Sequence, residues 1–116
     1  MSMSAAHADA LTSQQRGKRF EVAASVLALL ADRTRLALLN QLSLGEADVT
    51  TLTEAIGASR PSVSQHLAKL RLAGLVAARK DGRHVVYSLH HGHLRRLVEE
   101  SLNVADHRIG SLPPHD

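Results

Sequence analysis

Apolar residues recur at three- and four-residue spacing along most of the chain, a pattern typical of amphipathic helices. The first such segment, about Arg19 to Ala31, is apolar over more of its circumference than one small core needs. Its apolar residues are Phe20, Val22, Ala23, Val26, Leu27, Leu29 and Leu30. We therefore predict a helix that partly contacts a partner. Asp32 can cap a second helix, which continues to about Leu42 and stops at Gly45.

The central stretch TLTEAIGASRPSVSQHLAKLRLAGLV predicts two short helices joined by a tight turn. Thr51 and Glu54 have the spacing of a capping box for the first helix. Ser59 can cap the second helix, Pro61 suits its first turn, and Gly74 ends it. Together these signals predict a helix-turn-helix.

The second helix of this pair has an apolar side and a polar side. Val63, Leu67 and Leu70 are spaced to pack on the preceding helices. The polar side suits approach to base edges and phosphates, and its residues are Arg60, Ser62, Ser64, Gln65, Ala68 and Lys69. An ordinary solvated helix face is the alternative interpretation. His66 borders the apolar side, where a structural role is as reasonable as a functional one.

A hairpin is predicted directly after the helix pair. The stretch LVAARKDGRHVVYSL alternates apolar and polar residues on both sides of Asp81–Gly82, a dipeptide that favours a type I′ turn. The strands are expected at about Leu75–Arg79 and His84–Leu89. A charged hairpin tip often serves solubility alone, but after a helix-turn-helix it predicts a wing that contacts DNA phosphates. The basic residues near this tip are Arg79, Lys80 and Arg83. The expected fold is therefore mainly α with a small β-hairpin, a winged helix-turn-helix.

A last helix follows Gly92, because apolar residues recur at helical spacing from Leu94 to Ala105 without a further Gly or Pro. Histidines gather at both of its ends, and they are His90, His91 and His93 at the start and His107, after Asp106, at the far end. A helix rises about 1.5 Å per residue, so His93 and His107 are separated by roughly 21 Å. No small ligand joins both ends of one such helix.

The composition agrees with a small helical protein and excludes several kinds of chemistry. Of 116 residues, 44% are hydrophobic but only 2% aromatic, and the net charge of +3 allows an anionic partner. Cysteine is absent, which excludes disulfides and thiolate metal sites. No apolar run is long enough for a membrane span or a signal peptide, so we expect no membrane contact and a cytoplasmic protein.

The chain has room for one domain with a modest core, and a partner subunit often supplies the missing burial at this size. We expect a folded DNA-binding and dimerisation domain over residues 17–109. The polar residues 1–16 are expected to form a flexible N-terminal arm, and residues 110–116 a flexible C-terminal tail.

From about Phe20 to His107 the sequence resembles the ArsR/SmtB family of small dimeric winged-helix, metal-sensing transcriptional repressors. The stretches LADRTRLALLNQL, SVSQHLAKLRLAGLV and DGRHVVYSL, followed by the closing helix, carry the resemblance in this order. The family implies a homodimer built from the first and last helices. It also implies binding to double-stranded operator DNA without metal, and release of the DNA when a transition-metal ion arrives.

The resemblance also implies a metal site on the last helix. In the family this site uses an acidic residue, a histidine two positions later, and two further ligands near the helix end. Here His91 stands at the acidic position, while His93 and His107 match two of the ligands. Val104 occupies the remaining ligand position and cannot bind metal, which puts a standard tetrahedral zinc site in doubt.

Other residues are candidates to complete the shell. Asp106 next to His107 resembles a nickel- and cobalt-responsive branch of the family, in which histidines of a flexible tail also bind. His115 in the tail and His7 in the arm are such candidates. Ni²⁺ and Co²⁺ often take five or six nitrogen and oxygen ligands, so a site without cysteine suits them, and Zn²⁺ is a further possibility.

The spacing of the histidines favours sites shared between two chains. Steps of about 100° per residue bring His107 to within about 40° of His93 around the helix. In two antiparallel copies related by a two-fold axis, His93 of one chain therefore lies beside His107 of the other.

Two other functions compete with this hypothesis. An enzyme or a metal carrier is disfavoured, because the sequence has no HExxH pair, no phosphate-binding glycine loop and no nucleophile with a base. The alternative that stays open is a winged-helix regulator that senses no metal, or one that activates transcription without metal. The remaining predictions concern surface residues. We expect His84 and His90 to lie on the wing, and Arg95 and Arg96 to form ion pairs with Glu99 and Glu100 on the last helix.

Overall fold

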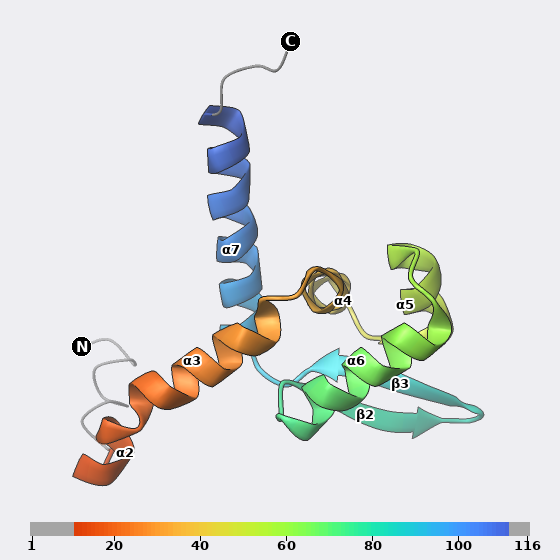
Figure 1. The fold of residues 1–116 in the computed structure, drawn as a ribbon. Coiled ribbons are helices and arrows are strands. Elements are labelled where there is room, and N and C mark those ends of the chain that lie inside the picture. The colour runs from red at the N-terminus through yellow and green to blue at the C-terminus, as the bar shows by residue number, and fades with distance from the viewer. Residues whose placement is uncertain (1–10, 112–116) are drawn as a thin grey trace. The chain divides into compact units, whose positions relative to one another are not determined.

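The computed structural model describes residues 11–111, which fall into two units with a boundary between Ala31 and Asp32. The first unit contains α2 (Ser13–Gly17) and α3 (Arg19–Leu30). The elements of the second unit, in chain order, are α4 (Arg33–Leu44), β1 (Ala47–Asp48), α5 (Val49–Ile56), α6 (Arg60–Leu72), β2 (Val76–Asp81), β3 (His84–Leu89) and α7 (Gly92–Ser111) (Figure 1).

In the first unit, α2 begins inside the predicted flexible arm, residues 1–16, and ends one residue past it. Thr12 and Gln15 form a complete capping box, in which each side chain accepts from the backbone N–H of the other residue. This local pairing explains why Ser13–Gly17 is helical. The predicted helix α3 begins at Arg19 as expected and ends at Leu30, one residue earlier than expected.

In the second unit, α4 is capped as predicted, because Asp32 Oδ1 accepts from Arg35 N at 2.9 Å. The helix continues to Leu44, two residues past the expected end, before Gly45. The predicted capping box of α5 is wrong. Asp48 caps this helix by accepting from Thr51 N at 2.8 Å, so the helix begins at Val49 and Thr51 lies inside its first turn.

The helix α6 has the predicted signals at both ends. Ser59 Oγ accepts from Ser62 N at 3.3 Å, and Pro61 lies in the first turn. At the other end Gly74 adopts φ 77°, and Leu75 N donates to Leu70 O at 2.9 Å. These contacts close the helix end in the way that a left-handed glycine permits. The predicted helix-turn-helix is therefore formed by α5 and α6.

The predicted hairpin is present, but its turn is of another type. Asp81 pairs with His84, so Gly82 and Arg83 form the two-residue loop. Only Gly82 has a positive φ, of 64°. A type I′ turn needs positive φ at both positions, whereas type II′ needs it at the first position only, so type I′ is wrong. In addition, β1 pairs with β3 (Ala47 with Tyr87), which gives the strand order β1–β3–β2.

The core of the second unit is built from leucines and valines of its four helices. The side chains with less than 2% exposure are Leu38, Leu39, Leu42, Leu52, Val63, Leu67, Leu70, Leu94 and Val98. Six of the nine come from α4 and α6. The helix α7 contributes only Leu94 and Val98, and every residue from Asn103 to Ser111 is exposed.

The arrangement of α7 explains this burial. It rises from the end of β3 as a long rod, and only its lower half lies beside α4 (Figure 1). It ends at Ser111, two residues past the predicted end of the domain. No helix within residues 11–111 has both the length and the apolar content of a membrane span.

Candidate nucleic-acid interface and metal site

The outward side of α6 carries exposed polar side chains that have no hydrogen-bond partner in the described part of the chain. Within residues 11–111, the side chains of Ser64, Gln65 and Lys69 are exposed and make no hydrogen bond or ion pair. Ser62 is half-buried, and its backbone N–H donates to Oγ of the cap residue Ser59. The opposite side of the helix is buried through Val63, Leu67 and Leu70. The polar side chains are thus held on a fixed helix and keep their donors and acceptors for another molecule.

A hollow at the start of α6 brings together two of the predicted DNA-binding arginines. Arg60 and Arg83 both line it, with His84 and Tyr87, and its volume is about 190 Å³. Arg60 Nη1 donates to Thr50 Oγ1 at 2.9 Å, which fixes the guanidinium beside the N-terminus of α6. Two guanidinium groups and the positive end of a helix dipole attract a phosphate group, while the carboxylate of Asp48, which also lines the hollow, opposes it.

The three basic residues of the hairpin have different surroundings. Arg79 pairs with Glu46 and lies 3.8 Å from Asp81, so its charge is partly neutralised. Lys80 and Arg83 are exposed, and neither has an ion pair among the described residues. We therefore expect Lys80 and Arg83 to attract DNA phosphates more strongly than Arg79.

His84 lies on the hairpin, as expected, and pairs with the cap residue of α5. Its Nδ1 is 3.1 Å from Asp48 Oδ2. The pKa of the Asp48 carboxyl is lowered, first by the hydrogen bond from Thr51 N and, to a smaller degree, by the nearby charge of His84. One carboxylate thus joins the start of α5 to the wing.

His66 has a structural role. Its Nδ1 lies 3.3 Å from Arg35 Nη1, and its Nε2 lies 4.0 Å from Asp32 Oδ1. The pKa of Asp32 is lowered, mainly by the hydrogen bond from Arg35 N. These three half-buried side chains connect the start of α4 to the middle of α6, and so help to hold α6 in place.

The histidines before and at the start of α7 lie close together. The ring centroids of His90 and His91 are 5.8 Å apart, and those of His91 and His93 are 5.7 Å apart. His91 directly precedes α7, and its Nδ1 accepts from Leu94 N at 3.3 Å. The ring of His91 therefore occupies the position of a helix cap. Two residues that are two positions apart in a helix lie on nearly opposite sides of it. Because α7 begins after His91, His91 is not held opposite His93 in this way.

His93 also has a bonded ring nitrogen. Its Nδ1 lies 2.7 Å from Arg96 Nη2. The predicted pairing of Arg95 and Arg96 with Glu99 and Glu100 is wrong. Within residues 11–111, no ion pair includes these glutamates, and Glu100 instead accepts from Asn103 Nδ2 at 3.4 Å.

The other predicted ligands lie at the far end of α7. Asp106 and His107 are exposed, and Val104 is 54% exposed between them and the start of the helix. Among the described residues of one chain, no three side chains of His, Asp or Glu are grouped to hold a metal ion. His7 and His115 lie outside the described residues. The described part of one chain therefore brings His91 and His93 together but leaves Asp106 and His107 apart from them.

Sequence reasoning missed three partners of the predicted site residues, which are Glu46, Thr50 and Arg96. It also missed Arg35, the partner of His66. Glu46, Thr50 and Arg35 lie at least ten positions along the chain from their partners, and no local pattern indicates such contacts. Arg96 could have been found, because it follows His93 by three residues and therefore lies on the same side of a helix.

Comparison with known proteins places these features in context. Residues 32–78 match the family model described as "Bacterial regulatory protein, arsR family". The chain is 44% identical over 90 residues to the HTH-type transcriptional regulator KmtR of Mycobacterium tuberculosis, covering 78% of this chain and 69% of KmtR. It is 43% identical over 84 residues to the HTH-type transcriptional regulator NmtR of the same organism, covering 72% and 70%.

Solved structures agree with the fold. A homodimeric winged helix-turn-helix DNA-binding domain of Mb0332 from Mycobacterium bovis matches with a TM-score of 0.75 and 29% identity, covering 92% of this chain and 99% of that domain. The transcriptional repressor BigR from Xylella fastidiosa matches with a TM-score of 0.71 and 31% identity, covering 81% and 96%. The predicted fold class, a winged helix-turn-helix, is confirmed.

Proposed function

This chain belongs to the ArsR family of bacterial regulatory proteins, and we propose that it is a homodimeric, metal-responsive repressor of transcription. It is a regulator and not an enzyme, as its relatives and structural neighbours are. In this proposal the dimer binds double-stranded operator DNA in the cytoplasm and releases it when Ni²⁺, Co²⁺ or Zn²⁺ binds. Two features of the chain carry the proposal. The side chains of Ser64, Gln65 and Lys69 on α6 are exposed and unbonded among residues 11–111, and α7 has histidines near both of its ends.

The DNA-binding part of the proposal rests on α6 and the wing. Ser64 and Gln65 are short polar side chains that suit base edges in the major groove. Lys69, Lys80 and Arg83 add positive charge on the helix and the hairpin for phosphates. Arg60, fixed by Thr50, suits a phosphate at the helix start. Base contacts would specify the sequence, whereas phosphate contacts would orient the protein on it.

The dimer part rests on apolar side chains that the two terminal helices expose. On α3, Phe20 is 90% exposed, with Val22 and Leu27 also exposed. On α7, Val104 and Ile109 are more than half exposed. A second copy of the chain would bury them, and the related Mb0332 domain is homodimeric.

The metal part rests on the kind and position of the donors. Imidazole and carboxylate donors without thiols fit Ni²⁺ and Co²⁺ well and also accept Zn²⁺. We propose His93 of one chain and His107 of the other as the main ligands, with Asp106 and His91 beside them. His7 and His115 are proposed to complete the shell. A bound metal ion would supply a cross-link between the start of one α7 and the end of its partner.

A metal ion weakens operator binding only if it binds the free dimer more tightly than the DNA-bound dimer. This coupling is reciprocal, so operator DNA must weaken metal binding by the same factor. The test is calorimetric titration of the dimer with Ni²⁺, Co²⁺ and Zn²⁺, followed by operator binding in the presence of each metal. We expect one or two ions per dimer and an operator affinity that falls when they bind. Tight operator binding that no metal changes would instead support a regulator that senses no metal.

A further inference from the structure

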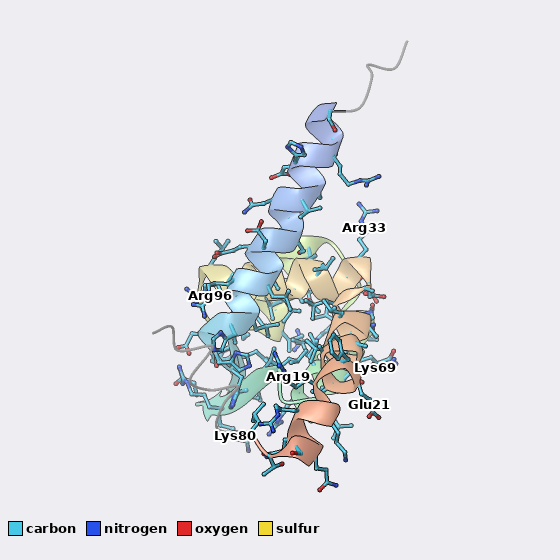
Figure 2. The ribbon with its side chains drawn as sticks, turned by 90° about the vertical axis from the view of Figure 1, so that its left-hand side faces the viewer. Arg19, Glu21, Arg33, Lys69, Lys80 and Arg96 are labelled. Atoms are coloured by element: carbon cyan, nitrogen blue, oxygen red, sulfur yellow. The ribbon has the colours of Figure 1, made fainter. Side chains whose placement is uncertain are left out.

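Arg96 contacts the nitrogen of a proposed ligand. Its guanidinium Nη2 lies 2.7 Å from His93 Nδ1, a distance typical of a strong hydrogen bond. Both side chains are exposed on the half of α7 that lies nearer the sheet, where Figure 2 shows Arg96.

The direction of this hydrogen bond is fixed by the chemistry of its two groups. A guanidinium has only donors, so His93 Nδ1 must accept. A neutral imidazole has one nitrogen with a free electron pair, while the other nitrogen carries the hydrogen. A neutral His93 ring that makes this hydrogen bond therefore carries its hydrogen on Nε2 and gives its free electron pair to Arg96.

A metal ion needs the same electron pair. If the metal binds Nδ1, Arg96 must leave. If the metal binds Nε2, the hydrogen must be on Nδ1, which then no longer accepts from Arg96. The hydrogen bond and the metal bond thus exclude each other at either nitrogen.

Other interactions do not account for the position of Arg96. A cation near a helix N-terminus is disfavoured by the helix dipole. Glu100, one turn later, is bonded to Asn103 instead. At Gly92 a Cβ atom would lie 3.8 Å from Arg96 Nη1, so the arginine side chain folds back towards the helix start. Among residues 11–111, the ring nitrogen of His93 is the hydrogen-bond partner of Arg96 in this position.

We propose that Arg96 sets the metal affinity of the site by competing with the metal for His93. The inference rests on the proposed function, because it requires His93 to be a ligand. Arg96 holds His93 in a form that cannot bind metal, and each binding event must first release the arginine. The site is therefore weaker, and responds at a higher metal concentration, than the same ligands without Arg96.

The test compares Arg96→Met with Arg95→Met in the full-length dimer. Methionine keeps much of the side-chain length but cannot donate a hydrogen bond. Arg95 is the matched control, because it is the adjacent exposed arginine and makes no hydrogen bond or ion pair among the described residues. Both variants lose one positive charge from the same part of α7, but only Arg96→Met also loses the contact with His93. Affinities for Ni²⁺ and Zn²⁺ are measured by competition with a chromogenic chelator at one pH and one salt concentration.

We expect Arg96→Met to bind metal roughly three- to tenfold more tightly than wild type, as the loss of one charge-assisted hydrogen bond implies. Arg95→Met should stay within about twofold of wild type, since exposed charges at this separation interact weakly. A second readout needs no metal. In ¹H–¹⁵N spectra of the neutral metal-free protein, wild-type His93 should be in the Nε2–H form, and Arg96→Met should show a measurable share of the Nδ1–H form.

The variant His93→Ala separates the two possible failures. If His93→Ala leaves metal binding unchanged, the proposed function fails and the inference fails with it. If His93→Ala weakens metal binding but Arg96→Met and Arg95→Met bind equally, only the role of Arg96 is overturned.

Discussion

The helices α6 and α7 differ in how completely one chain supports them. In α6 the buried residues Val63, Leu67 and Leu70 extend over most of the helix, and contacts at both ends fix its length. In α7 the buried residues Leu94 and Val98 lie near the start, and the half beyond them is exposed. The surface proposed to bind DNA is therefore complete in one chain, whereas the surface proposed to bind metal is incomplete without a second chain.

This difference suggests how metal binding at α7 can affect DNA binding by α6. An isolated helix segment as short as the outer half of α7 is only marginally stable in water, so packing on a partner would stabilise it. The helix α6, in contrast, is already packed within its own chain through Val63, Leu67 and Leu70. We therefore infer that metal changes the relation between two subunits more than the shape of either recognition surface.

The largest expected effect is on stability. Leu67→Ala in α6 should lower the free energy of unfolding by about 2–5 kcal/mol at every protein concentration, because it leaves a cavity in the core. Val104→Ala in α7 should lower it by less than about 0.5 kcal/mol for the subunit itself and act mainly on dimer association. Chemical denaturation at several protein concentrations measures both. Equal, concentration-independent losses would contradict the comparison.

The second expected effect is on operator recognition. Gln65→Ala or Ser64→Ala should weaken specific binding by roughly 1–3 kcal/mol and relax the base preference, because these side chains are proposed at base edges. Metal binding by the free dimer should not change. Binding to the operator and to an unrelated sequence is compared by fluorescence anisotropy, and equal weakening on both would remove these residues from the base contacts.

A third, smaller effect concerns the anchoring of α4 and α6. The pKa of Asp32 lies below its ordinary value of 3.8 in the folded protein, so its carboxylate stabilises the fold above that pH. This stabilisation is lost as the pH falls below 3.8 and through the folded pKa. Asp32→Ala should destabilise the protein by about 1 kcal/mol near neutral pH, as the loss of a helix cap does. In denaturation at several pH values the gap to wild type should narrow in acid, and a constant gap would exclude the carboxylate as its cause.

The smallest expected effect distinguishes the basic residues of the wing. Lys80→Ala or Arg83→Ala should weaken binding to all DNA and lower the salt slope by about one for each phosphate that the protein no longer neutralises. Arg79→Ala should lower it less, because Glu46 and Asp81 already offset the charge of Arg79. A larger change for Arg79 than for Lys80 would mean that DNA displaces these carboxylates.

The contrast between α6 and α7 also shows what the sequence could predict. The limits of α6 were predictable because Ser59, Pro61 and Gly74 act on the backbone next to them. The same local reasoning failed at α5, where Asp48, three residues before Thr51, offers the stronger acceptor. It also missed β1, because two residues form a strand only by pairing with β3 far along the chain.

The candidate site was predictable where residue type alone decides its chemistry. Histidines at both ends of one helix were visible in the sequence, and the structure keeps those ends apart. The hydrogen bonds that modify these residues were not visible. The contact between Arg35 and His66 joins residues 31 positions apart, and the bond between Arg96 and His93 competes with an equally plausible pair with Glu100.

The most direct test of the shared metal site mixes two inactive variants. His93→Ala and His107→Ala should each fold and bind operator, but each homodimer should lose its metal response because both of its sites are broken. After subunit exchange, a heterodimer joins the intact His93 of one chain to the intact His107 of the other at one of its two sites. Tight Ni²⁺ or Co²⁺ binding should then return at roughly a quarter of all sites, as random pairing predicts. A mixture with proven subunit exchange and no recovered tight binding would contradict the shared site and place the ligands within one chain.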